Sequence, residues 1–220
     1  MRILLAIDGS PSSIKARDLI ASLPWPPETV IGLVAAYQAP VDWSTGVASH
    51  AALAGDAAEA VHSELGEQLR DLGEPLSARG WAVEPRLIRE RPATAIVAAA
   101  AEFDADLVVV GSRGHGALYS MLLGSVAAEV VNMAPCPVLV ARDEDISHAL
   151  IATDGSPTAR AIPEVLRRWN VLRGVQAEVL SVAPRDSPAY ELMVGLYTLG
   201  STRIGEEHTD LLERCRRDAD

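Results

Sequence analysis

Residue types suited to holding a phosphate group gather in one stretch of the chain, Asp106 to Val131. An uninterrupted apolar run, Leu107 to Val110, predicts a strand buried on both faces. The run leads into Gly111 and Gly114, and Gly124-Ser125 stands immediately before a helix-like pattern. A strand, a glycine-rich turn and a helix start together bring main-chain N–H groups up to an anion, with the positive end of the helix behind them. The spacing therefore predicts a phosphate-binding loop.

This glycine pattern differs from the two common phosphate-binding fingerprints. It is not G-x-G-x-x-G, and no lysine follows Gly124 as a P-loop requires. We expect glycine at 111 and 114 because a Cβ would hold the chain away from a phosphate or forbid a positive φ. A β-turn followed by a capped helix without any ligand explains the same glycines equally well.

A second candidate, Asp8, follows the short apolar strand predicted over Ile3 to Ile7. Doubly wound sheets bind their ligands in a crevice outside the carboxyl ends of the strands. We expect the Asp8 carboxylate to point into that crevice. The alternative is an aspartate that shapes a turn or caps the helix predicted from Pro11 to Leu23.

Three segments, GSRGHG (111–116), LLGSV (122–126) and APCPVLV (134–140), resemble the universal stress protein family in its nucleotide-binding branch. The family motif G-x2-G-x9-G-[ST] is matched at Gly111, Gly114, Gly124 and Ser125. The resemblance covers residues 1–142 well. It implies an α/β fold, a doubly wound three-layer sandwich around a five-stranded parallel sheet of order 3-2-1-4-5. It also implies ATP as the ligand, with AMP as an alternative.

The resemblance also implies a set of nucleotide-binding residues, with Mg²⁺ held by Asp8 and with main-chain groups of Ala36 facing the adenine. This set is Ala6, Asp8, Gly9, Ser10, Ala36, Val110, Gly111, Arg113, Gly114, Gly124, Ser125 and Val126. One position departs from the family pattern, since Ala127 stands where many members have serine. The lost hydroxyl should weaken binding about fivefold without abolishing it.

Hydrophobic periodicity predicts alternating strands and helices along the first two thirds of the chain. The strands are expected at 3–7, 30–37, 81–89, 107–110 and 138–141, and the helices at 11–23, 56–78, 93–103 and 126–133. Residues 40–56 are expected to form a loop, and the charges of the third strand predict a half-exposed sheet edge.

An internal repeat follows, because ALIATDGSP (149–157) restates ILLAIDGSP (3–11) and places Asp154 where the first copy has Asp8. A helix over 159–169, a strand over 175–183 and a helical stretch from about 188 complete the chain. We therefore expect one complete domain, 1–142, and a truncated second copy, 147–220. The second copy lacks the glycine motif, so we assign it no nucleotide site.

Composition narrows the classes of partner. A formal net charge of −11 argues against nucleic acid or an anionic membrane. No apolar run approaches the roughly 18 residues of a membrane span, and Met1 leads directly into a strand, so we expect a cytoplasmic protein. Two cysteines, Cys136 and Cys215, form neither a disulfide framework nor a zinc set, and Cys136 is expected to be a buried structural thiol.

We expect a sensor or regulatory module that changes its surface when ATP binds and acts on a downstream protein partner the residues do not identify. We assign no catalytic residue. The alternative is a slow ATPase or phosphotransferase in which Asp8 holds Mg²⁺ and Arg113 stabilises developing charge. His115 has no orienting carboxylate at a recognisable spacing. The apolar fifth strand, 138–141, predicts an open edge that pairs in a homodimer.

Overall fold

The computed structural model describes residues 1–37, 51–114, 123–154, 156–157 and 159–181. The chain divides into two compact units, one of Met1–Leu23 with Pro27–Asp145 and one of Pro24–Pro26 with Ile146–Asp220. Each unit is described by itself.

The first unit contains a five-stranded sheet in which every strand is parallel to its neighbours. Its strands are β1 (Arg2–Ala6), β2 (Val30–Tyr37), β3 (Ala82–Arg89), β4 (Leu107–Gly111) and β5 (Val138–Ala141). Their order is β3-β2-β1-β4-β5, which confirms the predicted α/β fold and strand order. The order reverses at β1, so the carboxyl ends of β1 and β4 flank the position where doubly wound sheets bind ligands.

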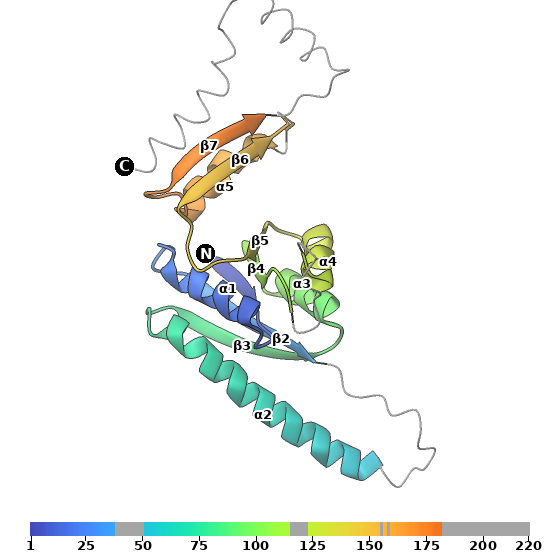
Figure 1. Cartoon of the computed structure of the whole chain (residues 1–220). Coiled ribbons are helices and arrows are strands. Elements are labelled where there is room, and N and C mark those ends of the chain that lie inside the picture. The colour runs from blue at the N-terminus through green and yellow to red at the C-terminus, as the bar shows by residue number, and fades with distance from the viewer. Residues whose placement is uncertain (38–50, 115–122, 155, 158, 182–220) are drawn as a thin grey trace, which may run out of the picture. The chain divides into compact units, whose positions relative to one another are not determined.

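Helices cover both faces of this sheet (Figure 1). They are α1 (Pro11–Ser22), α2 (Ala51–Ser77), α3 (Pro92–Glu102) and α4 (Ser125–Met133). Helix α1 packs beside α2 and α3 packs beside α4, which gives the three layers of the predicted sandwich. Proline stands at the start of both α1 and α3, where its fixed φ suits a helix and its missing N–H costs nothing.

Apolar residues are buried on both faces of the sheet, and one core cluster lies between the sheet and the α3–α4 layer. Phe103, which follows α3, is fully buried with Leu4 and Val108. A β-carbon on Gly32 of β2 would lie only 3.1 Å from the Phe103 ring, so glycine makes room for the aromatic side chain. The guanidinium of Arg2 stacks 4.0 Å from the centre of the same ring.

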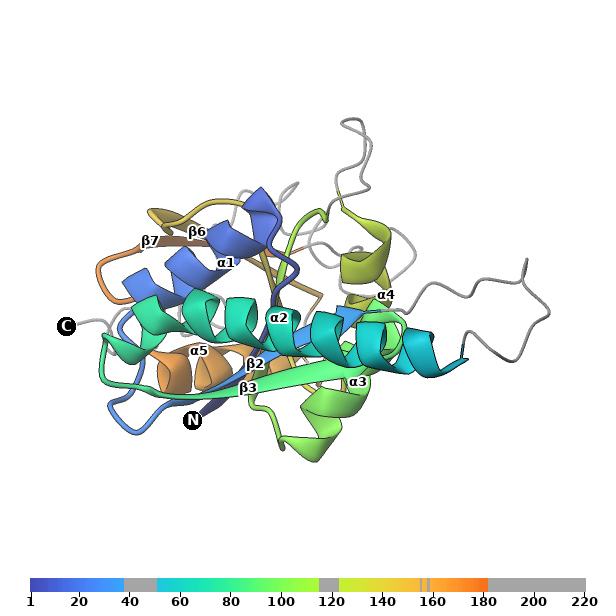
Figure 2. The ribbon, with the colours of Figure 1, turned by 90° about the horizontal axis from the view of Figure 1, so that it is seen from below.

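Helix α2 starts earlier than the sequence predicted. Residues 51–56 are helical, so the prediction of a loop over 40–56 is wrong in that part, and 38–50 lie outside the described residues. Figure 2 shows α2 lying along β2 and β3. A β-carbon on Gly73 would come within 3.1 Å of Val83 and 3.2 Å of Leu33, so this glycine lets the helix approach the sheet closely.

The two edge strands of the sheet differ in character. Strand β3 is only half-buried along its length, as its charges predicted. Strand β5 consists of apolar residues that are also only half-buried until Ala141. Nearby on α4, Val131 and Met133 are 46% and 58% exposed, which extends the apolar surface beside the β5 edge.

The second unit contains a parallel pair, β6 (His148–Thr153) and β7 (Gln176–Ser181). Between them lie a short 3-10 turn η2 (Ala159–Ala161) and helix α5 (Ile162–Trp169). These elements fall where the repeat predicts a strand, a helix and a strand. The helix expected from about 188 lies outside the described residues. No helix in the described part of the chain is long and apolar enough to cross a membrane.

Candidate functional site

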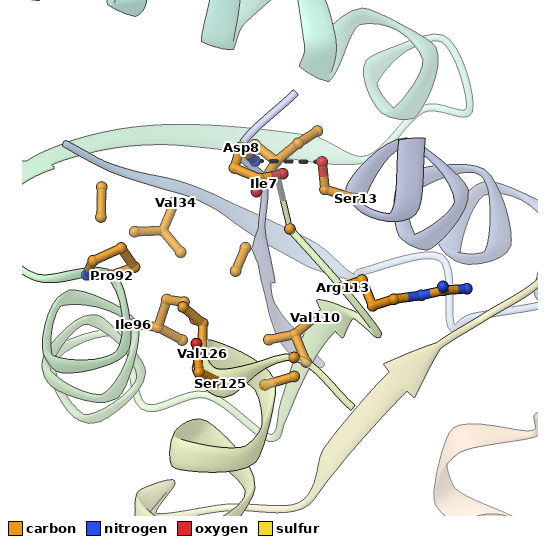
Figure 3. Close-up of a pocket in the computed structure, with 16 residues that line it drawn as sticks. Ile7, Asp8, Ser13, Val34, Pro92, Ile96, Val110, Arg113, Ser125 and Val126 are labelled. Carbon is orange, nitrogen blue, oxygen red and sulfur yellow. Dashed lines mark hydrogen bonds between the residues drawn. The ribbon is translucent and has the colours of Figure 1, made fainter. Parts of the chain in front are cut away.

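A cavity of about 340 Å³ opens at the carboxyl ends of the strands in the first unit (Figure 3). Its volume falls within the roughly 300–1,000 Å³ range of small-molecule sites. It is lined by the ends of β1, β2 and β4, by the glycine segment and by the starts of α3 and α4. The lining residues are Ala6, Ile7, Asp8, Ser13, Val34, Ala36, Pro92, Ile96, Val110, Gly111, Arg113, Gly114, Gly124, Ser125, Val126 and Ala127.

Ten of the twelve residues predicted from the sequence line this cavity. Those ten are Ala6, Asp8, Ala36, Val110, Gly111, Arg113, Gly114, Gly124, Ser125 and Val126. The structure therefore brings residues from four separate chain segments together at one crevice. Their predicted contacts with a nucleotide stay predictions.

Gly9 and Ser10 do not line the cavity. Ser10 is only 2% exposed, and its hydroxyl accepts a hydrogen bond from the Ser13 amide at 3.3 Å, which caps α1. Gly9 has a φ of 76°, a left-handed conformation that favours glycine in this turn. Both residues shape the turn that carries Asp8.

The structure gives the glycines at 111 and 114 a role that the sequence did not suggest. Neither has a positive φ. A β-carbon on Gly111 would lie 2.7 Å from the main-chain carbon of Ser12 and 2.9 Å from the Ser13 amide nitrogen. A β-carbon on Gly114 would lie 2.9 Å from Oδ2 of Asp8. Glycine thus lets the end of β4 and the following loop approach the start of α1.

The start of α4 forms the opposite wall. Gly124 is its N-cap residue, and within the described residues no side chain caps the helix. The first amides of a helix have no partner within the helix itself, and in α4 these are the amides of Ser125, Val126 and Ala127. The Gly124 amide is already used, because it donates to Ser112 O at 2.8 Å and closes the base of the loop.

Asp8 is the only carboxylate among the lining residues. Its Oδ1 accepts a hydrogen bond from the Ser10 amide at 3.0 Å. No group of three or more possible metal ligands among His, Cys, Asp and Glu occurs in the described residues. Asp8 is therefore the one lining residue whose side chain could hold a Mg²⁺, an ion that proteins often bind through one or two carboxylates.

Arg113 lines the cavity, but its side chain does not turn into it. In Figure 3 the guanidinium extends away from the other labelled side chains. The residue is exposed. The prediction that Arg113 contacts a phosphate therefore has no support from this side-chain conformation. His115 lies outside the described residues.

Six lining residues are not in the predicted set, and most of them are apolar. They are Ile7, Ser13, Val34, Pro92, Ile96 and Ala127. Val34 could have been found, since it lies two residues before Ala36 on the same face of β2. Pro92 and Ile96 carry no local signal, because only the reversal of strand order places the start of α3 over the crevice.

The main chain of Ala36 also faces the cavity. The Val34 carbonyl accepts a hydrogen bond from the Ile7 amide at 2.9 Å. Residues two apart on a strand direct their main-chain groups to the same neighbour, so those of Ala36 also point to the β1 side. Strand β1 pairs with β2 only as far as Ala6 opposite Val34. The Ala36 amide and carbonyl therefore lie beyond the end of β1.

Cys136 lies outside the cavity and is about half-buried. Burial raises the pKa of its thiol, an effect that outweighs a hydrogen bond from the main chain of Val108. Since the thiolate is the reactive form, Cys136 is poorly suited to act as a nucleophile near neutral pH.

The sheet order and the crevice at its carboxyl edge define a doubly wound α/β protein of the type that binds ligands at the reversal of strand order. Comparison with known proteins narrows this class. The model of the universal stress protein family matches residues 1–142, so the chain belongs to the universal stress protein family.

Individual relatives agree with this assignment. A universal stress protein of Thermus aquaticus is 54% identical over 56 residues, which cover 26% of this chain and 41% of that protein. The match thus spans less than half of that relative. Universal stress protein YxiE of Bacillus subtilis is 28% identical over 145 residues, 64% of this chain and 98% of its own. The fold of this chain is similar to that of UspA from Lactobacillus plantarum, with a TM-score of 0.52 and 19% sequence identity. The similarity covers 64% of this chain and 97% of that one.

Proposed function

We propose that the cavity binds ATP together with Mg²⁺ and that the protein acts as a nucleotide-dependent sensor or regulatory module in a stress response. The observation that carries this proposal is the start of α4. It faces the cavity, and no side chain in the described residues caps it. Helix α1 begins at the same edge of the sheet, yet its own Ser10 caps it. The start of α3 also reaches the cavity without a side-chain cap, but Pro92 leaves it one amide fewer, so we assign the phosphates to α4.

The cavity also offers surroundings suited to the purine ring and to the metal ion. A purine ring would lie among Val34, Ile96 and Val126, and the Ala36 main chain would supply its hydrogen bonds. Asp8, across the cavity from α4, would hold the Mg²⁺ that accompanies the nucleotide. AMP fits the same apolar part but would reach less of the α4 wall, so ATP is the preferred ligand.

Chemistry beyond binding has less support. An ATPase or phosphotransferase needs a group that neutralises the developing charge, and the Arg113 side chain points away from the cavity. The enzyme alternative predicts ATP turnover that disappears in Asp8→Ala while ATP still binds. Turnover that stays at the level of buffer alone supports a binding module.

The ligand can be identified by releasing small molecules with acid from rapidly purified protein and measuring their mass. We expect ATP, in an amount that falls in Gly124→Asp. Recovery of AMP alone would overturn the preference for ATP. Protein that carries no nucleotide and takes none up on incubation would contradict nucleotide binding itself.

We also propose that the protein forms a homodimer through β5. This strand is apolar, pairs with β4 alone among the described strands, and lies beside the exposed Val131 and Met133. Pairing of two β5 edges would cover this surface. Pro137 and Ala141 accept hydrogen bonds from the β4 side, so the main chain of Val140 faces the open edge. Val140→Pro removes a donor from that edge and should turn a dimer into a monomer in sedimentation experiments. A wild-type chain that sediments as a monomer at micromolar concentration contradicts the dimer.

For the second unit, we propose a truncated copy of the first that has no nucleotide site of its own. Its two described strands match the first two strands of the complete unit, including a parallel register. A binding stoichiometry of two nucleotides per chain would contradict this proposal.

A further inference from the structure

The Asp8 turn contains a closed set of hydrogen bonds around the Ser13 hydroxyl. The Asp8 amide donates to Ser13 Oγ at 3.3 Å, as the dashed line in Figure 3 marks. Ser13 Oγ in turn donates to Ser10 O at 3.0 Å. The Ser10 amide donates back to Asp8 Oδ1 at 3.0 Å. Both the main chain and the carboxylate of Asp8 are thereby held.

From this geometry we infer that Ser13 is the positioning residue that orients Asp8 towards a divalent cation on the nucleotide. The inference rests on the proposed function. Ser13 lines the cavity and is only 3% exposed. Because its single hydroxyl proton goes to Ser10 O, it has no proton left to donate to a phosphate. Its effect on a ligand therefore passes through Asp8.

Positioning matters here because Asp8 is exposed at the mouth of the cavity. An exposed carboxylate in a turn samples several orientations. Binding a metal restricts it to one of them, which costs conformational entropy. A turn that is already ordered reduces this cost. Oδ1 is directed to the Ser10 amide, and Oδ2 lies next to Gly114 in the glycine segment.

The repeated sequence in the second unit provides an internal comparison. There the Ser156 amide donates to Asp154 Oδ1 at 2.9 Å, and the Ala159 amide donates to Ser156 Oγ at 3.2 Å. Both bonds reproduce those of the first turn. Ala159, however, stands in the place of Ser13 and has no hydroxyl to accept from the Asp154 amide. The Ser13 hydroxyl is thus a feature that separates the turn at the cavity from its copy.

The test compares ATP binding by the full-length chain in Mg²⁺ and in EDTA, measured by calorimetry. Ser13→Ala places in the first turn the residue that the second turn has at the corresponding position, Ala159. We expect ATP affinity in Mg²⁺ to fall about fivefold, the loss of roughly one hydrogen bond, while affinity in EDTA stays unchanged. Asp8→Asn should remove the whole Mg²⁺-dependent gain. Ser13→Thr, which keeps the hydroxyl, should retain it, and Ala159→Ser should change nothing.

The results separate this inference from the proposed function. Wild-type protein that binds no ATP in either buffer contradicts both. If wild-type protein binds ATP equally in Mg²⁺ and EDTA, nucleotide binding stands and the inference is wrong. The inference is also wrong if Ser13→Ala lowers affinity equally in both buffers, which would indicate a general role in pocket structure, or if it changes neither.

Discussion

A β-carbon on Gly114 would lie 2.9 Å from Oδ2 of Asp8, so the glycine segment and the first turn of the chain are in direct contact. Gly111 makes the corresponding approach to the main chain of Ser12 and Ser13. Two of the motif's glycines therefore bring the glycine segment into contact with the segment from Asp8 to Ser13. Phosphate binding would depend on this junction even though neither glycine needs a left-handed conformation.

This contact predicts different outcomes for two alanine substitutions. In Gly114→Ala the new methyl group meets only the end of the Asp8 side chain, so ATP affinity should fall about tenfold, equivalent to about 1.4 kcal/mol, with little change in melting temperature. In Gly111→Ala it meets main-chain atoms that cannot turn aside. We expect its free energy of unfolding to fall by about 1–3 kcal/mol. Calorimetry and urea unfolding measure the two quantities, and equal stability of both variants would contradict the argument.

A second pair tests the packing of α2. Gly66 has open space around it, with only the end of Arg70 at 4.0 Å, whereas Gly73 is close to Val83 and Leu33. Gly66→Ala should raise the free energy of unfolding by about 1 kcal/mol through helix propensity. Gly73→Ala should lower it despite the same gain in propensity. Urea unfolding of both variants decides, and stabilisation by both would show that α2 does not pack as closely as described.

The open start of α4 predicts the behaviour of Gly124→Asp. A carboxylate at the N-cap would bond to the amides that we assign to phosphate and would also repel it. ATP affinity should fall by more than about tenfold, while the stability of the nucleotide-free protein holds or rises. Gly124→Asn caps without charge and should lose less affinity. If both variants bind ATP as the wild type does, the phosphate does not lie at this helix.

Ala127 occupies the third position of α4 and lines the cavity. Ala127→Ser supplies the hydroxyl that the motif otherwise lacks. We expect ATP to bind about fivefold more tightly, the value of roughly one added hydrogen bond. Titration calorimetry measures this change, with Ala128→Ser on the same helix as the control. A weaker binding by Ala127→Ser would indicate that its side chain does not face the phosphates.

The pH dependence of the second turn follows from Asp154. The main-chain hydrogen bond from Ser156 holds the pKa of its carboxyl below the usual range. Since the pKa is lower in the folded protein, the ionised carboxylate favours folding above the unfolded pKa, and this contribution disappears as pH falls through the folded pKa. An NMR titration should show the lowered midpoint, and it should return to the usual range in Ser156→Pro. A midpoint at or above the usual range in the wild type would contradict the hydrogen bond.

The family resemblance implied the sheet order and twelve binding residues, ten of which are among the sixteen lining residues. The signal that carries the resemblance is local. Strand β4, the glycines and the Ser125 helix start are consecutive in the chain, and the family motif covers them. Pro92 and Ile96 were missed since their place over the crevice depends on how α3 crosses the sheet. Gly111 and Gly114 line the cavity as predicted, but their contacts with Ser12, Ser13 and Asp8 were not foreseen, since those residues are about 100 positions away in sequence.

Ser10 is a residue whose role the sequence alone could not decide. Its sequence context, Asp-Gly-Ser-Pro, is compatible with a ligand contact and with a helix cap. The sequence does not distinguish between these two roles. The structure places its hydroxyl on the Ser13 amide, as a cap. The same cap recurs at Ser156 in a turn to which we assign no nucleotide.

Calorimetric titration of nucleotide-free, full-length protein with ATP, in the presence and absence of Mg²⁺, tests the central claim most directly. The account predicts saturable binding of one ATP per chain that Mg²⁺ strengthens and that Gly114→Ala weakens. A flat titration in both buffers would show that the amides at the start of α4 do not hold a nucleotide.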